Sequence, residues 1–160
     1  MISEKMPTSV PIDRSSFVDA DEARKWFEIQ RWPHGVPCPH CDNSNQVKIK
    51  LLQGKSHRPG LYECAECRQQ FTVTVGTVMH RSKIPLNKWL LAMQLISAPE
   101  KPASARQLRH ALGISYHSAW YISHRIRRLI GDEVAANLQG DALGREYDHA
   151  NASKLLLRKL

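Results

Sequence analysis

Two short stretches, Cys38-Pro39-His40-Cys41 and Cys64-Ala65-Glu66-Cys67, contain all four cysteines of this 160-residue chain. Each is a C-x2-C pair, and 22 residues separate the two pairs. Two thiolates three residues apart on a tight turn can face one ion, and a second turn brought up by a β-hairpin completes a tetrahedron. The spacing therefore predicts a Zn²⁺ site with four ligands, Cys38, Cys41, Cys64 and Cys67.

Two other interpretations of the cysteines agree less well with the sequence. Two disulfides would need an oxidising compartment, and no secretory signal peptide is visible. A thioredoxin-like redox site would need one C-x-x-C pair in a βαβ setting, not two pairs. Because four soft ligands leave no open position on the ion, the site is expected to be structural. His40, His57 and His80 are near in sequence and are expected to be bystanders.

The charge of the chain is concentrated in its middle. The net charge is +8, and residues 31–130 carry 15 Lys/Arg against 4 Asp/Glu, whereas both ends are slightly acidic. This concentration favours a polyanionic partner such as nucleic acid, although a solvated basic surface gives the same count. No apolar run approaches the roughly 20 residues that span a bilayer, so no membrane association and a cytoplasmic location are expected.

The first half of the sequence predicts a small zinc ribbon behind one helix. An amphipathic helix is expected from about Asp19, with Glu22 in a capping-box position, to just before Pro33. Alternation of polar and apolar residues predicts strands at 46–52, 61–63 and 70–75. The expected fold class is thus α+β: a three-stranded antiparallel sheet with a four-cysteine zinc site and an N-terminal helix, followed by an all-α helix-turn-helix domain. The expected domains are an arm (1–16), the helix plus ribbon (17–80), the helix-turn-helix (84–131) and a tail (132–160).

The second half changes to helical periodicity. Helices are expected at 86–97, 105–112 and 116–130, with a proline-containing linker at 98–102. Ser104 and Ser115 are expected to cap the last two helices, and Gly113 lies in the turn between them. Gly131 is expected to end the last helix, and the Leu-rich end at 152–160 could form a terminal helix that packs on the body or on a second copy.

The last helix has one apolar and one basic face. Ala119, Ile122 and Ile126 fall in a narrow sector, and polar residues lie opposite, as in a recognition helix that enters the major groove. Arginine can pair with guanine, and serine or histidine can contact bases or phosphates. The candidate DNA-binding residues are Ser115, Tyr116, His117, Ser118, Tyr121, His124, Arg125, Arg128, Arg106, Lys48 and Lys50. An ordinary amphipathic helix with a solvated polar face is the alternative.

Several blocks of the sequence resemble a known family. Arg31-Trp32-Pro33-His34-Gly35, the CPHC pair, residues 62–89 (YECAECRQQFTVTVGTVMHRSKIPLNKW) and residues 104–127 (SARQLRHALGISYHSAWYISHRIR) occur in the order found in the N-terminal part of bacterial insertion-sequence transposases with a zinc ribbon. The resemblance covers about residues 17–130. It implies a module that recognises transposon ends, with the four cysteines as zinc ligands and the Ser115–Arg128 helix reading DNA.

The sequence departs from that family in two respects. Glycine usually follows the first cysteine pair, and here Asp42-Asn43 follows; both residue types tolerate a left-handed backbone. The family continues into an RNase H-like domain whose carboxylates bind two metal ions, and this chain stops about where that domain would start. Five acidic residues of the tail, Asp132, Glu133, Asp141, Glu146 and Asp148, are expected to be solvated and not to bind metal.

We therefore expect a non-catalytic, zinc-dependent protein that binds double-stranded DNA, derived from an insertion-sequence transposase and acting as a regulator, accessory protein or remnant. Two alternatives are the targeting subunit of a split transposase, and a protein–protein adaptor that binds a partner through the ribbon or the C-terminal tail. Homo-oligomers are also compatible with the sequence. DNA binding would place the protein at the nucleoid. Arg125→Ala is expected to relax sequence preference, and Lys50→Ala to weaken binding to all sequences alike.

Overall fold

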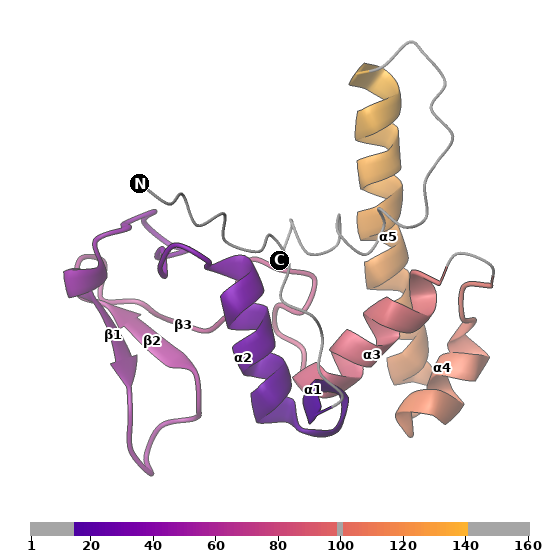
Figure 1. Cartoon of the computed structure of the whole chain (residues 1–160), viewed down its shortest axis with the longest axis horizontal. Coiled ribbons are helices and arrows are strands. Elements are labelled where there is room, and N and C mark those ends of the chain that lie inside the picture. The colour runs from indigo at the N-terminus through magenta and orange to yellow at the C-terminus, as the bar shows by residue number, and fades with distance from the viewer. Residues whose placement is uncertain (1–14, 99–100, 141–160) are drawn as a thin grey trace, which may run out of the picture.

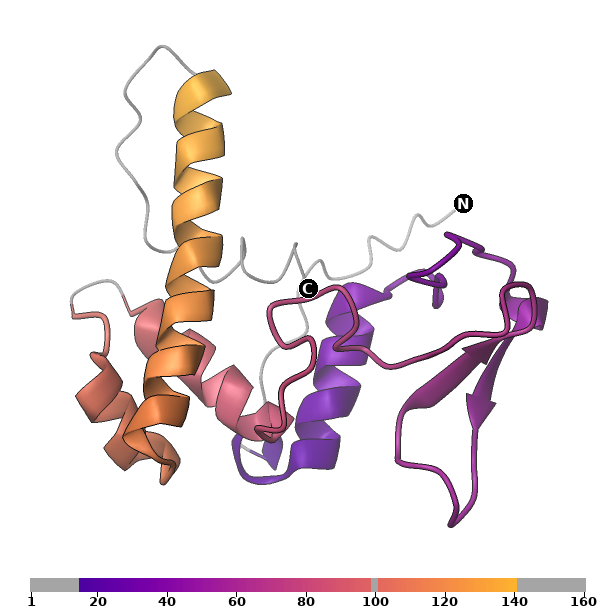
Figure 2. The same ribbon diagram turned by 180° about the vertical axis from the view of Figure 1, so that it is seen from behind.

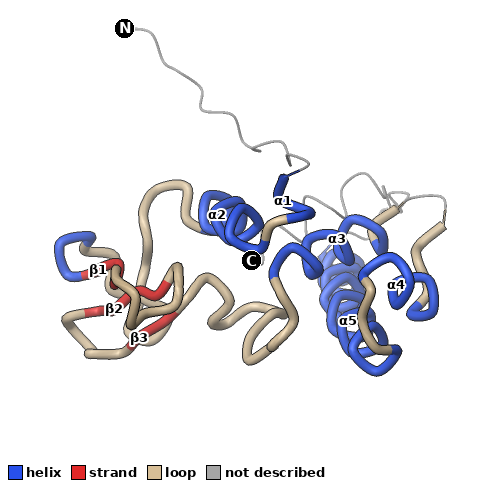
Figure 3. Tube along the Cα trace, turned by 90° about the horizontal axis from the view of Figure 1, so that it is seen from below, coloured by secondary structure: helices blue, strands red, loops and turns tan. Residues whose placement is uncertain are grey.

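The computed structural model describes residues 15–98 and 101–140, with side chains described up to Gly131. A small sheet lies at one end, three helices lie at the other, and α2 stands between them (Figures 1 and 3). In chain order the elements are α1 Ser15–Val18, α2 Ala20–Arg31, the 3₁₀ helix η1 Gln46–Lys48, β1 Ile49–Leu52, β2 Leu61–Cys64, β3 Gln70–Phe71, α3 Leu86–Ile96, α4 Ala105–Leu112 and α5 Tyr116–Gly140. The predicted α+β class, with a zinc ribbon before a helical region, is confirmed.

Some predicted features fall on residues that are not described. The described residues exclude most of the predicted arm and the middle of the proline-containing linker. They also exclude most of the predicted tail, including its terminal helix. Within the part that is described, no helix is both long enough and apolar enough to cross a membrane.

The sheet has the antiparallel order β1-β2-β3. Ile49 pairs with Cys64 and Tyr62 pairs with Phe71, so the second cysteine pair is attached directly to the central strand. The first strand is shorter than predicted, because Gln46–Lys48 forms a 3₁₀ turn. Asn45 caps this turn: its side chain accepts a hydrogen bond from the backbone N–H of Val47 at 3.1 Å.

The third strand is only two residues long, so the predicted strand at 70–75 is wrong beyond Phe71. Residues 72–77 form turns instead, with Val75 N donating to Thr72 O and Thr77 N donating to Thr74 O. The Thr72 and Thr74 hydroxyls also bond each other at 2.9 Å. Alternating threonine and valine is a strand pattern, but these local hydrogen bonds compete with the ladder. We call residues 72–85, which join β3 to α3, the connecting loop.

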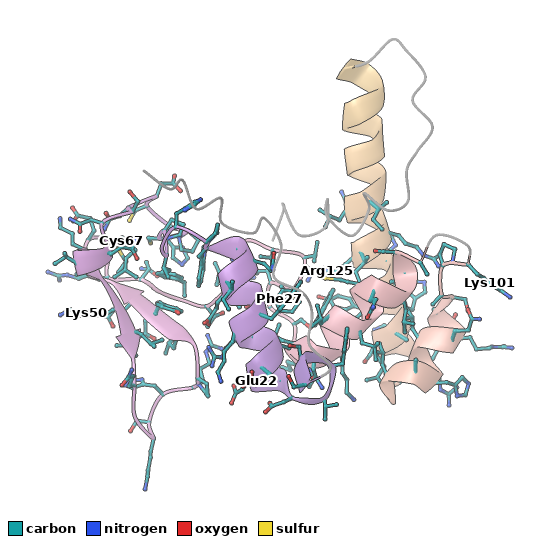
Figure 4. The ribbon with its side chains drawn as sticks, viewed as in Figure 1. Glu22, Phe27, Lys50, Cys67, Lys101 and Arg125 are labelled. Carbon is teal, nitrogen blue, oxygen red and sulfur yellow. The ribbon has the colours of Figure 1, made fainter. Side chains whose placement is uncertain are left out.

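Helix α2 joins the two ends of the molecule. Asp19 is its N-cap as predicted, but the carboxylate accepts from Asp21 N at 2.8 Å and no capping box with Glu22 forms. The buried face carries Trp26 and Phe27, and Figure 4 shows Phe27 on the side toward α3. The helix therefore packs on α3.

The ribbon is held against α2 by close packing. A Cβ at Gly60, where φ is +72°, would lie 2.5 Å from Arg24 Cδ, so the hairpin loop approaches the helix as only glycine allows. Arg24 in turn donates to Glu28 at 2.8 Å. On the same side, the ring of Trp32 packs edge-on against Tyr62 at 5.4 Å and Phe71 at 6.2 Å. These contacts fix the ribbon to the end of α2.

The α4–α5 unit has the predicted caps. Ser104 and Gln107 form a reciprocal capping box at the start of α4, and Gly113 ends that helix in the left-handed conformation with φ 59°. The Ser115 hydroxyl accepts from the backbone N–H of Ser118 at 3.1 Å and so caps α5. Helix α5 does not end at Gly131 but runs to Gly140. One glycine costs only about 1 kcal/mol relative to alanine in a helix, which is too little to stop it.

A single core cluster extends through both ends. It contains Phe71 and Val73 of the ribbon side, Phe27 of α2, Trp89 of α3 and Ile122 of α5, all at most 1% exposed. Trp89 is also held by a 3.1 Å hydrogen bond from its Nε1 to the Ser82 hydroxyl. The ribbon and the helices therefore share their buried residues, and the division predicted at residues 80–84 stays a prediction.

Candidate zinc centre and nucleic-acid interface

The fold brings the four cysteine sulfurs together. Cys38 Sγ lies 3.6 Å from Cys67 Sγ, and Cys41 Sγ lies 3.8 Å from Cys64 Sγ. All four sulfurs lie within 4.8 Å of one another, and none forms a disulfide. A tetrahedral Zn²⁺ with Zn–S bonds of about 2.3 Å holds its sulfurs about 3.8 Å apart. The arrangement therefore fits one Zn²⁺ with four thiolate ligands.

The two cysteine turns have the same backbone geometry. Asp42 N donates to Cys38 O at 2.9 Å, and Arg68 N donates to Cys64 O at 2.8 Å. The residue after each pair is left-handed, with φ 56° at Asp42 and φ 57° at Arg68. The expectation that Asp42 replaces the usual glycine is thus confirmed, whereas nothing in the sequence indicated the left-handed Arg68. Each of these two similar turns therefore contributes two cysteine sulfurs to the same group of four.

Hydrogen bonds and desolvation shift the pKa values of Cys41 and Cys64 in opposite directions. The backbone N–H of Cys67 is the main cause that lowers the pKa of Cys64 to about 6, and the Asn43 side chain adds to it. At Cys41 the backbone N–H of Asn43 acts in the same direction, but desolvation and the neighbouring thiols raise the pKa to about 12. Zinc binds the thiolate form of cysteine, so its binding releases the thiol protons and acid should displace it.

The histidines near the cysteines are engaged elsewhere. His80 Nδ1 accepts from Gly76 N at 3.1 Å, and the His40 ring lies 6.4 Å from the ring of Phe71. Among the side chains that the structure describes, the four cysteines form the one group of three or more His, Cys, Asp or Glu with ligand-compatible spacing. The site is closed and structural, as predicted.

Helix α5 exposes part of the predicted polar face. Its first turn, with Ser115 and His117, and the later residues His124 and Arg128 are exposed, and its opposite face buries Ala119, Ile122 and Ile126. On α4, Arg106 and Arg109 are exposed as well. The structure therefore gathers most of the predicted DNA-binding residues on the two helices of the α4–α5 unit.

Tyr121 and Arg125 are exceptions on this face, because they are half-buried against the connecting loop. Arg125 donates to the carbonyls of Val78 at 2.7 Å and His80 at 2.9 Å. Its guanidinium also lies 5.0 Å from the centre of the Tyr121 ring. The assumption that Arg125 points freely outward is wrong, since a helical wheel cannot show a loop that returns over the helix.

A second arginine holds the other part of the connecting loop. Arg31, at the end of α2, donates to Val73 O at 2.5 Å and lies 5.5 Å from the Trp32 ring. Figure 2 shows the loop passing α2 on its way from the ribbon to α3. Beside it, a cleft of about 610 Å³ lies between loop residues Gly76–Val78 and residues of α5 that include His124 and Arg128. Two arginines thus tie the loop to α2 and α5.

The two ribbon lysines lie apart from the α4–α5 unit. Lys48 is paired with Glu66, and Figure 4 places Lys50 at the outer edge of the ribbon, with α2 between it and Arg125. Lys50 and Leu51 are exposed on the edge strand β1. A ligand that touched both Lys50 and α5 would have to extend along the molecule.

One exposed residue was missing from the sequence prediction. Trp120 is 50% exposed and stacks on His124, with ring centres 5.2 Å apart and planes 9° apart. His117 lies on it at 6.5 Å and 25°. The spacing of 117, 120, 121 and 124 was visible in the sequence and is the spacing of base-facing residues on a recognition helix. Trp120 is neither charged nor part of the apolar sector, so neither charge nor hydrophobic periodicity points to it.

The fold and site define a class of protein: a four-cysteine zinc ribbon joined through α2 and the connecting loop to a basic helical unit. Residues 19–70 match the family model described as the transposase zinc-ribbon domain. Over 125 residues the chain is also 28% identical to an uncharacterized protein in the transposable element ISH50 of Halobacterium salinarum. This alignment covers 78% of the chain and 40% of the relative, so the chain spans about two fifths of the relative's length.

No solved structure matches the chain significantly. The resemblance to the N-terminal part of insertion-sequence transposases is confirmed, and with it the zinc ribbon and its structural Zn²⁺.

Proposed function

We propose that this protein binds double-stranded DNA in a zinc-dependent manner, and that α4 and α5 form a helix-turn-helix whose second helix reads the sequence. The observation that carries the proposal is the α4–α5 unit itself. Gly113 turns the chain, Ser115 caps α5, and His117 and His124 are exposed along the start of that helix. Helix N-termini also attract phosphates through their free N–H groups and dipole.

The cations around the unit support the same proposal. Arg106 and Arg109 on α4 and Arg128 on α5 are exposed and can each neutralise a phosphate. Arg127 donates to Ala103 O at 2.9 Å, which ties α5 to the segment before α4. The ribbon lysines Lys48 and Lys50 form a second, separate set that would touch the backbone further along the duplex.

We further propose that the described part of the chain supplies recognition and no catalysis. Strand transfer by two metal ions needs several carboxylates that converge on two ions about 3.5–4 Å apart, and the described side chains include no group of three or more acidic residues with ligand-compatible spacing. The protein would then act as a transposase-derived regulator of transcription, an accessory factor of transposition or a remnant, at the nucleoid in the cytoplasm. In this proposal residues 17–80 form the helix plus zinc ribbon, and residues 84–131 form the helix-turn-helix domain.

Two other functions remain open to test. The targeting subunit of a split transposase would show the same DNA binding and also retain a separate catalytic chain. A protein–protein adaptor is favoured by one observation, the exposure of Val47 (85%) and Leu51 (45%) on the ribbon. For the adaptor, a partner that co-purifies after nuclease treatment is expected, together with weak and salt-insensitive DNA binding.

Binding should weaken steeply with salt. If Arg106, Arg109 and Arg128 each contact a phosphate, log K should fall by about 2.7 per log unit of salt, since each contact contributes about 0.9. Arg106→Ala should lower that slope by about 0.9 and weaken all sequences alike. Fluorescence anisotropy with a labelled duplex between 50 and 300 mM KCl measures both.

Lys50→Ala tests the ribbon end in the same titration. A lower salt slope would mean that Lys50 also contacts the phosphate backbone of the DNA. An unchanged slope would mean that only the α4–α5 unit contacts the phosphates. Duplex binding that does not respond to salt, or no binding by the zinc-loaded protein, would reject the proposed function.

A further inference from the structure

Among the described side chains of α5, the indole of Trp120 is the largest apolar group with substantial exposure. It is 50% exposed, although a tryptophan is mostly buried in a folded protein. Most of the residues around it have a polar or cationic group. Trp120 lines a pocket of about 360 Å³ together with six other residues, Ser104, Ala105, Ser123, His124, Arg127 and Arg128.

The charge around Trp120 favours a polyanion as the ligand. Arg127 and Arg128 line the same pocket, and no Asp or Glu is among its lining residues. We take duplex DNA as the ligand because α5 is the proposed recognition helix, and the inference below rests on the proposed function.

Two histidine rings stack beside the indole. His117 is one turn before Trp120, at 6.5 Å and 25°, and His124 is one turn after it, at 5.2 Å and 9°. Base stacking uses a ring face, and the close, nearly parallel ring of His124 already takes such a position. We therefore infer that the exposed half of the indole offers an apolar contact to the edge of a base.

We propose that Trp120 is a specificity-determining residue whose edge contacts the C5-methyl group of thymine in the major groove. Among the base edges in that groove, only thymine presents a methyl group, and apolar side chains recognise it by contact. The histidines on either side hold the indole in place and can bond adjacent bases through their ring nitrogens. The site thus combines one apolar contact with two polar ones.

Thymine methyl groups can be removed one at a time to test this. The probe is the best duplex obtained by selection from random sequences, with each thymine in turn replaced by deoxyuridine. For the wild-type protein, removal at one or two positions should weaken binding about three- to fivefold, as expected for losing one buried methyl contact. Trp120→Ala should bind more weakly and should respond to none of these replacements, whereas Trp120→Phe should recover part of the response.

Arg128→Ala is the matched control on the same helix. As a phosphate contact it should weaken the thymine and deoxyuridine duplexes by the same factor. Circular dichroism of Trp120→Ala should match the wild type, because the indole is outside the core. A deoxyuridine response that persists in Trp120→Ala would overturn the inference, as would no response in the wild type or a change of oligomeric state on substitution. If the wild type binds no duplex at all, the proposed function itself fails.

Discussion

Cys64→Ala is expected to unfold the ribbon, residues 36–77, and to abolish stoichiometric zinc binding. The structural ion in zinc-finger peptides contributes on the order of 10–16 kcal/mol of apparent folding free energy, more than a sheet of three short strands can supply. The loss should extend beyond the metal, since Phe71 and Val73 belong to the core shared with α2 and α3. Zinc content by mass spectrometry and far-ultraviolet circular dichroism measure the two effects.

His57→Ala is the control for this substitution. His57 is exposed in the hairpin loop. The His57→Ala protein should therefore still bind one zinc ion per chain and give an unchanged circular dichroism spectrum. A Cys64→Ala protein that kept its zinc and its spectrum would contradict the four-cysteine site.

Arg125→Ala is expected to destabilise the fold by about 2–3 kcal/mol, because it removes a charged donor from the carbonyls of Val78 and His80. Arg125→Lys should restore little, since one ammonium lacks the planar fork that reaches two carbonyls. Chemical unfolding of the zinc-loaded proteins measures the difference.

Arg128→Ala is the control, because Arg128 is one turn away on the same helix and is exposed. It should lower DNA affinity with little change in stability. The two arginines would then have opposite roles on one helix: Arg125 holds the connecting loop and Arg128 contacts DNA. An Arg125→Ala variant with wild-type stability and relaxed sequence preference would instead support the role predicted from sequence alone.

The zinc site could be predicted from sequence because its determinants are local. Two C-x2-C turns fix the ligands, and Asp42 tolerates the left-handed backbone that the first turn needs. The caps at Ser104 and Ser115 are equally local, since each hydroxyl bonds a backbone N–H three residues ahead. Such features depend on neighbouring residues, so a sequence shows them directly.

The features that were missed depend on distant parts of the chain or on small energies. Arg125 is half-buried by a loop more than 40 residues earlier in the sequence, and Trp120 gained its role from two ring contacts on its own helix that hydrophobic periodicity does not show. The predicted strand does not continue after Phe71, because Thr72 and Thr74 form local hydrogen bonds in turns instead. Gly131 did not end α5. A glycine in a helix destabilises it only slightly relative to alanine, and this cost is smaller than the stabilisation gained by continuing the helix.

The role of the ribbon follows from these contacts. The connecting loop is tied to α2 by Arg31 and to α5 by Arg125, and it begins at the sheet that the zinc site completes. If α5 binds DNA as we propose, zinc acts on that binding indirectly, by holding the loop against which α5 packs. Chelation should for this reason weaken DNA binding even if no ribbon residue touches the duplex.

Selection of binding sites from a random duplex library with the zinc-loaded protein tests the central claim most directly. We predict one enriched motif for the wild type, and a changed or lost preference at its central positions when His117 and His124 are both replaced by alanine. An inverted repeat in the motif would indicate that two copies bind together. Recovery of a library with no enriched sequence, or of the same motif with the double variant, would contradict the claim that α5 reads DNA.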